Sequence, residues 1–338
     1  MTKVSFVIPT LNRGRYVVRA VASCLAAARK ANVTADVVVL DSQSDDGSWE
    51  ALNQAYSAHP EVLLAQNARG LGPTRSWLDG ADLVSGDFVT FIWSDDYVAP
   101  DILVRLLPSL SDGADLALGR GVIRDVDDES PFPISGKCRQ VDPEEMLKGY
   151  FGTSPVVLNP PASPACALFS RSAFDSWRQK MPELCHSDEL AEQLMWRRAI
   201  GPDMLLFMIA LGRQNGPFAW IEDALVQFSA HADSITISSP SWLLKAGYWA
   251  ARCEALLEQT VSGRVLSQER RAMTARTILQ GMALLKGIPR QQKGIEASAV
   301  RRDVRRRLAQ LFQQEGGTLA ILPDLIRAGV LELRKLAP

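Results

Sequence analysis

The sequence is poor in the residues that mark several common classes of protein. Its 338 residues include only three histidines and five cysteines, and no two cysteines form a Cys-x-x-Cys pair. This argues against a disulfide framework and a zinc knuckle, and it favours a reducing compartment. No apolar run approaches the ~20 residues of a membrane-spanning helix, and the first residues lack the long apolar core of a signal peptide. We therefore expect a cytoplasmic protein.

An excess of charge of one sign is also absent. The chain has 37 basic and 38 acidic residues and a net charge of -1. Proteins that bind DNA or RNA usually carry a basic excess, so we expect no nucleic-acid partner. The balance is uneven along the chain, because residues 285–338 hold 11 Lys and Arg against 5 Asp and Glu. A basic tail of this kind favours an anionic partner.

The first hundred residues alternate between strand and helix patterns. Short apolar runs typical of buried strands occur at residues 4–8, 36–40, 61–65 and 87–93. Between them, apolar residues recur at helical spacing at 14–30, 47–57 and 73–83. This alternation predicts an α/β fold with a mainly parallel sheet flanked by helices, whose ligand lies beyond the carboxyl ends of the strands. Further helical patterns follow at 188–198 and 203–211, and the chain after residue 240 is almost wholly helical in pattern, so we place a boundary there.

Polar residues stand where three of these strands end. Thr10 and Asn12 follow the first strand, Asp41 follows the second, and Asp95 and Asp96 follow the fourth. Adjacent carboxylates repel each other, and a divalent cation would relieve that repulsion. Such a cation can also neutralise a diphosphate as it departs. The structural alternatives are capping residues at strand-to-helix turns and a solvated acidic turn.

Five segments along the chain together resemble family 2 glycosyltransferases, which have the GT-A fold. They occur in the family's order, at residues 9–13, 41–48, 86–96, 200–207 and 228–236. The segment at 67–76 matches the family more loosely, and the resemblance spans roughly residues 1–240. It implies a Rossmann-like catalytic domain over 1–240, with a donor half at 1–110 and an acceptor half at 111–240. A helical C-terminal subdomain would occupy 241–338.

The resemblance also implies residue roles. The nucleoside-diphosphate sugar would be bound by Thr10, Asn12, Arg13, Asp41, Arg75 and Asp95. Asp96 and His231 would bind Mg²⁺ or Mn²⁺, and Asp203 would be the general base. From the residues alone, Asp203 could equally be a helix N-cap and His231 a packed or surface histidine.

Besides Leu11, which stands where the family often has tyrosine, three residues depart from the family's pattern. Ser94 replaces the first acid of an Asp-x-Asp triplet, Pro202 replaces the acid before the base, and Ser229 stands where arginine is common before the histidine. These departures leave open a non-catalytic nucleotide-sugar-binding protein as the alternative. A sugar nucleotidyltransferase is less favoured, because the loop at 9–14 contains one glycine where that class has a glycine-rich, basic loop.

The resulting hypothesis is an inverting, metal-dependent glycosyltransferase. Its acceptor would be a glycan or lipid-linked glycan, in the biosynthesis of a bacterial surface polysaccharide such as lipopolysaccharide. The arginine-rich run at 301–307, with the apolar stretch at 319–323, fits a helix on anionic lipid, which would make the protein peripheral on the inner face of the cell membrane. The alternative is a helical subdomain that packs on the sheet or forms a homodimer.

Overall fold

The computed structural model describes residues 2–110, 113–128, 130–155, 158–161, 163–231, 239–258, 267–291 and 295–336. The chain forms two compact units. The first, called here the sheet unit, comprises Met1–Val141, Pro161–Gln179 and Arg213–Ser238. The second, the helical unit, comprises Asp142–Pro160, Lys180–Gly212 and Ser239–Pro338. The division by function, 1–240 against 241–338, stays a prediction.

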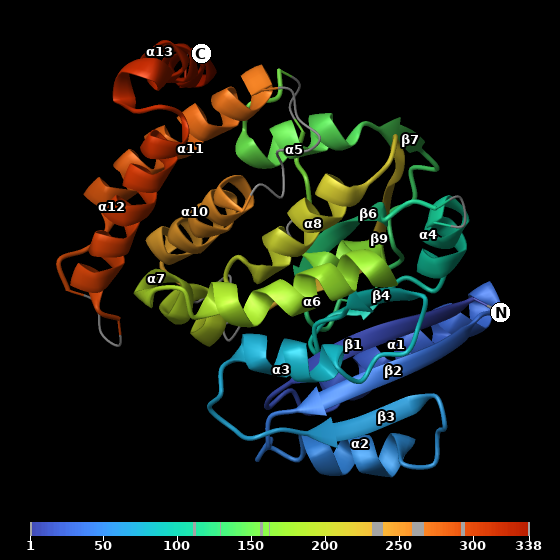
Figure 1. Ribbon diagram of the computed structural model, residues 1–338. Helices are drawn as coiled ribbons and strands as arrows, with labels where there is room; N and C mark the ends of the chain where they lie inside the picture. The colour runs from blue at the N-terminus through green and yellow to red at the C-terminus, as the bar shows by residue number, and fades with distance from the viewer. Residues whose placement is uncertain are drawn as a thin grey trace. The chain divides into compact units, whose positions relative to one another are not determined.

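Nine strands within the described residues form one sheet in the sheet unit. Their bounds are β1 (Lys3–Thr10), β2 (Thr34–Asp41), β3 (Val62–Gln66), β4 (Phe88–Phe91), β5 (Tyr97–Val98), β6 (Leu116–Asp125), β7 (Cys138–Val141), β8 (Ala167–Ser170) and β9 (Phe218–Ala230). The order is β3-β2-β1-β4-β8-β6-β9-β5, with β7 paired to β9. β3, β2, β1 and β4 are parallel and lie side by side in Figure 1. β8 then joins antiparallel to β4.

The first four strands are linked by helices, as the apolar spacing predicts. These are α1 (Arg15–Ala31), α2 (Ser48–Tyr56) and α3 (Pro73–Ala81); α4 (Ile102–Leu110) follows β5, and α6 (Arg171–Cys185) follows β8. Of the apolar positions that the spacing selects in α1, Val21, Leu25 and Ala28 are buried and Val18 is half-buried against the core. The expected strands and helices of the first hundred residues are therefore confirmed to within a few residues at their ends.

In the described residues the helical unit contains the C-terminal part of α6 and eight further helical segments. They are α5 (Pro143–Phe151), α7 (Glu189–Ala191), a π-helical turn (Glu192–Trp196), α8 (Pro202–Arg213), α10 (Ser241–Leu257), α11 (Ser267–Gly287), α12 (Ala297–Gln314) and α13 (Thr318–Leu336). α10 packs against α11 and α12, and α13 packs against α11 (Figure 1). In the part of the chain that the structure describes, no helix has both the length and the apolar character to cross a bilayer.

The arginine-rich run on α12 is divided between two environments. Arg302 and Arg305 face solvent, whereas the side chain of Arg307 is 2% exposed and forms ion pairs with Asp188 and Glu254. Helical periodicity explains the division, because residues two positions apart lie on opposite faces. The expectation that the whole run meets a lipid surface is therefore wrong for Arg307.

Candidate active site

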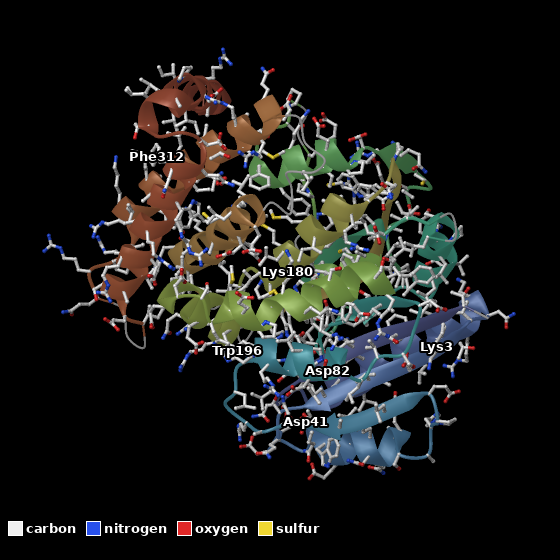
Figure 2. The ribbon with its side chains drawn as sticks, in the orientation of Figure 1. Lys3, Asp41, Asp82, Lys180, Trp196 and Phe312 are labelled. Atoms are coloured by element: carbon white, nitrogen blue, oxygen red, sulfur yellow. The ribbon has the colours of Figure 1, made fainter. Side chains whose placement is uncertain are left out.

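The carboxyl ends of β1 and β2 bring two predicted site residues together. Thr10 is paired with Asp41 in the parallel register, and Figure 2 labels Asp41 at the end of β2 that is remote from Lys3. The Asp41 side chain accepts hydrogen bonds from the backbone N–H of Ser44 at 3.0 Å and from Nε2 of Gln66 at 2.8 Å. These bonds hold the carboxylate at the carboxyl edge of the sheet.

Thr10 has a buried hydroxyl that the protein does not use. Its residue is 4% exposed, and Oγ1 has no hydrogen-bond partner among the described residues. Oδ1 of Asn67, the residue that follows β3, is also buried without a hydrogen-bond partner among the described residues. A buried polar group without a partner costs stability, and such groups call for an explanation such as a ligand or a water.

Asn12 and Arg75 make their contacts within the protein. Asn12 lies in the left-handed region at φ 53°, and its side-chain amide exchanges hydrogen bonds of 2.8 and 3.0 Å with Asp45. It thereby ties the loop after β1 to the loop after β2. Arg75 is on α3 and pairs with Asp79 one turn later, with 2.6 Å between Nε and Oδ1. The nucleotide-sugar contacts expected of Asn12 and Arg75 stay predictions.

The Asp95–Asp96 pair follows β4 and meets residues from three other segments. Oδ2 of Asp95 lies 2.6 Å from Nε2 of His231 and 3.4 Å from Nε of Arg13. Asp96 is 4% exposed, and its Oδ1 accepts a 2.8 Å bond from the backbone N–H of Ser229. Burial, and next to it the charge of Asp95, raise the pKa of Asp96. Three of the residues predicted from separate motifs, Arg13, Asp95 and His231, thus form one cluster.

Arg19 is a member of this cluster that sequence reasoning missed. From α1 it donates hydrogen bonds to the backbone oxygen of Asp95 at 3.2 Å and to Oγ of Ser229 at 3.3 Å. Its guanidinium also lies over the ring of Tyr97, 4.5 Å from the centroid. In the sequence Arg19 is an ordinary polar position of an amphipathic helix, so no signal pointed to it.

The residues of this cluster fit a divalent cation. Two adjacent carboxylates, one of them almost wholly buried, supply oxygen donors of the kind that Mg²⁺ and Mn²⁺ prefer. Among the described side chains no three acidic, histidine or cysteine groups surround one point, so further ligands would come from phosphate oxygens and water. His231 faces Asp95 here, and its role as a metal ligand stays a prediction.

Asp203, the predicted base, is the second residue of α8 in the helical unit. Its Oδ1 accepts bonds from the backbone N–H groups of Gly201 at 3.2 Å and Met204 at 2.8 Å, and its Oδ2 accepts one from the hydroxyl of Tyr248 at 3.3 Å. This pattern is not that of an N-cap, which accepts from a residue two or three positions ahead. Burial raises the pKa of Asp203 to about 7, the range in which a carboxyl group works best as a base at neutral pH.

Three comparisons with known proteins bear on this arrangement. The family model described as glycosyl transferase family 2 matches residues 5–178. The abequosyltransferase RfbV of Salmonella typhimurium is 31% identical over 116 residues, 34% of this chain and 34% of that protein. Chondroitin synthase of Escherichia coli is 28% identical over 134 residues, 39% of this chain and 19% of that protein. The chain thus spans about a third or less of the length of these relatives.

Among solved structures, residues 1–349 of Staphylococcus aureus TarS match with a TM-score of 0.59. The sequence identity is 14%, and the match covers 92% of this chain and 81% of that one. The same protein in complex with UDP-GlcNAc matches with a TM-score of 0.58 and 14% identity, covering 92% of this chain and 89% of that one. The expected GT-A fold is confirmed by this likeness.

Proposed function

The chain belongs to glycosyl transferase family 2, and on that premise we propose that it transfers a sugar from a nucleoside diphosphate to a hydroxyl group, with inversion at the anomeric carbon. The observation that carries the proposal is the group of polar side chains at the carboxyl edge of β1, β2 and β4. A buried carboxylate at Asp41, an unpaired hydroxyl at Thr10 and the Asp95–Asp96 pair occur there together.

The donor is held by residues that already stand in fixed positions. Asp41 accepts hydrogen bonds and suits an N–H group of a nucleobase. The Thr10 hydroxyl can donate or accept, and a bond from the nucleotide would satisfy it. Arg13 forms an ion pair with Asp95. The two side chains are therefore close enough to bind the same donor molecule, with Asp95 at the ribose. Asp95 itself accepts hydrogen bonds from hydroxyl groups of the donor.

Asp96 and its neighbours hold the divalent cation in this proposal. When bound, Mg²⁺ or Mn²⁺ neutralises charge on the diphosphate. Asp96 supplies one oxygen donor, and the Ser229 N–H fixes the orientation of its carboxylate. Arg19 donates a hydrogen bond to the backbone oxygen of Asp95 and so stabilises the turn that carries Asp95 and Asp96.

Asp203 removes the proton in this scheme. The acceptor oxygen forms a bond to the anomeric carbon while the bond from that carbon to the diphosphate oxygen breaks. The acceptor's proton passes to the Asp203 carboxylate, and the bonding electrons leave with the nucleoside diphosphate. A single base and a direct displacement give inversion. General-base help of this kind is typically worth ~10²–10⁴-fold in rate.

The acceptor is proposed to be a glycan or lipid-linked glycan of the bacterial surface. The similarity to the abequosyltransferase RfbV and to a poly(ribitol-phosphate) β-glucosyltransferase from Bacillus spizizenii, 28% identical over 89 residues, supports this class. Arg302 and Arg305 on α12 face solvent, and Leu319 and Ile326 on α13 are 86% and 60% exposed. The exposed arginines of α12 support a peripheral position on the cytoplasmic face of an anionic membrane, and the exposed apolar side chains of α13 support either that position or a homodimer.

A thermal-shift experiment on the full chain tests the donor site. We expect one of UDP, GDP and dTDP to raise the melting temperature only when Mn²⁺ is present, since a ligand that binds the native state stabilises it. Asp96→Asn should lose this response. Asp127→Asn, which alters a carboxylate 68% exposed on the same unit, is the matched control and should keep it. An Asp96→Asn response equal to that of the wild type would contradict the metal assignment.

Turnover then separates an enzyme from a non-catalytic binding protein. With the sugar nucleotide of the responding base and a bacterial glycolipid extract as acceptor, the wild type should release nucleoside diphosphate. Asp203→Asn should bind nucleotide like the wild type and release product at least a hundredfold more slowly. Binding without release in the wild type would favour the binding protein.

A further inference from the structure

Tyr248 lies on α10, beyond the segments that carry the family resemblance, yet its hydroxyl donates a 3.3 Å hydrogen bond to Oδ2 of Asp203. Both residues belong to the helical unit. We propose that Tyr248 is a positioning residue for Asp203, which orients the carboxylate and favours its ionised form so that it can accept the acceptor's proton. The inference rests on the proposed function, because it assigns Asp203 the role of base.

Two glycines fix the distance between α10 and the start of α8. Gly201 has φ +114°, and a Cβ added to it would lie 2.8 Å from the carbonyl oxygen of Gly247. A Cβ added to Gly247 would lie 2.6 Å from the carbonyl oxygen of Ile200. Only glycine at both positions leaves room for this close approach. The backbone of α10 at Gly247, next to Tyr248, therefore lies in contact with the backbone at 200–201, just before Asp203. This approach brings the hydroxyl of Tyr248 within hydrogen-bonding distance of the carboxylate.

Within the described part of the chain, the side chain that donates a hydrogen bond to the Asp203 carboxylate is that of Tyr248. The other groups that face the carboxylate are the backbone N–H groups of residues 201, 203 and 204. Asp203 has no basic side chain as an ion-pair partner among the residues that the structure describes. A carboxylate buried without a cation depends on hydrogen bonds for its stability, so the loss of one donor should have a measurable effect.

The hydroxyl of Tyr248 stays protonated and able to donate over the working pH range. The charge of Asp203, and next to it burial, raise the pKa of Tyr248 above its usual value. Arg252, one turn later on α10, is the positive group that acts on Tyr248, and its Nε donates to the backbone oxygen of Tyr150 at 2.7 Å. Burial lowers the pKa of Arg252 to about 10, so Arg252 keeps its charge across the range from pH 4 to 7 in which Asp203 titrates.

The test is Tyr248→Phe, which removes the hydroxyl and keeps the ring. Asp203 has a raised pKa, so the native state keeps the proton longer than the unfolded chain, and stability falls as pH rises from about 4 to about 7. The stability difference between wild type and Asp203→Asn, followed by urea unfolding from pH 4 to pH 9, should therefore level off near pH 7. The difference between Tyr248→Phe and the double variant should level off about one pH unit higher, because hydrogen bonds to ionised groups are among the stronger ones.

The same shift should appear in catalysis. The acidic limb of the pH profile of kcat/KM should move up by about one unit in Tyr248→Phe, with a loss of roughly tenfold near pH 6.5 and little loss at pH 9. KM for the donor should stay unchanged. Rates are expressed per folded enzyme, whose amount at each pH is known from the urea unfolding data, so partial unfolding of the variant does not contribute to the shift.

Tyr56→Phe is the matched control. Tyr56 donates a 2.9 Å bond to the backbone oxygen of Val18 in the sheet unit, so its variant loses a comparable hydroxyl and should keep both profiles. Identical profiles for Tyr248→Phe and the wild type would overturn the inference and leave the proposed function intact. Wild-type turnover in Asp203→Asn would instead overturn the assignment of the base, and with it both proposals.

Discussion

Replacing Arg307 by methionine should destabilise the protein strongly, because the guanidinium joins three segments of the helical unit. Its Nη2 lies 2.8 Å from Oδ2 of Asp188, and its Nη1 pairs with Glu254 on α10. The exposed fractions of the three side chains are 2% for Arg307, 4% for Asp188 and 9% for Glu254. Asp188 also caps α7, accepting a 2.8 Å bond from the backbone N–H of Ala191.

The expected loss of stability follows from the ion pairs and hydrogen bonds that each carboxylate retains when Arg307 is replaced. Asp188 retains Arg306 and its bond to the N–H of Ala191, whereas Glu254 loses the cation with which it forms its ion pair. Breaking one side of a buried ion pair typically costs ~3–5 kcal/mol. We expect a loss in that range from urea unfolding at pH 8. Arg305→Met, two residues away and exposed, should change the free energy of unfolding by less than about 0.5 kcal/mol.

The loss should also depend on pH. Burial already raises the pKa of Glu254, and Arg307 opposes that effect. Without Arg307 the pKa of Glu254 in the folded state rises further above its unfolded value. The native state then binds a proton that the unfolded chain has released, so stability falls with rising pH above the unfolded value. The defect of Arg307→Met should be smaller at pH 5 than at pH 8.

A second change decides whether the ion pair is the cause. Arg307→Met combined with Glu254→Leu removes both charges, and an apolar replacement of a buried pair is often neutral or stabilising. The double variant should therefore recover part of the loss. A single variant less than about 1 kcal/mol below the wild type, or a double variant less stable than the single one, would refute this reasoning.

Two further predictions concern the sheet unit and the surface of α12. Thr10→Val should weaken binding of the nucleoside diphosphate by about two- to tenfold in a calorimetric titration, and it should not lower the melting temperature, since among the described residues its hydroxyl has no hydrogen-bond partner to lose. Equal affinities would show that the hydroxyl does not contact the ligand. Neutralising Arg302 and Arg305 together should weaken binding to vesicles of phosphatidylglycerol at low salt, while Arg15→Ala, which alters an arginine side chain 74% exposed, should not. Unchanged vesicle binding in the double variant would remove the membrane proposal.

The sequence was sufficient to predict the edge of the sheet where the polar residues meet. Parallel strands joined by helices bring their carboxyl ends to one side, so Asp41 and Asp95 could be placed there from strand patterns alone. The pairing of Asp95 with His231 spans 136 residues of sequence. It was not predicted: the resemblance assigned His231 to the metal and Asp95 to the donor, and a single histidine near residue 230 carries no signal of its own. Such motifs record which residues are present, while distances come only from the fold.

Other features depend on contacts that a pattern does not encode. Arg307 stands in a run of arginines with the same hydropathy, and its burial is decided by the face of α12 that meets α10. The π-helical turn at Glu192–Trp196 interrupts what the apolar spacing predicts as a regular helix. In both cases tertiary packing overrides a local preference, which is weak compared with the burial of a large side chain.

The same reasoning explains why the pKa of the predicted base cannot be obtained from its motif. Asp203 comes from a segment shared with the family, but its bond to Tyr248 comes from the approach of α10 to the start of α8, and its burial raises its pKa. The approach depends on Gly201 before the motif's acid and Gly247 on α10, 46 residues apart in number, which no local pattern connects. A chain with the same acid and a different α10 would have a base with a different pKa. The C-terminal helices therefore set a chemical property of the site, and a comparison of pH profiles between Tyr248→Phe and the wild type measures how large that contribution is.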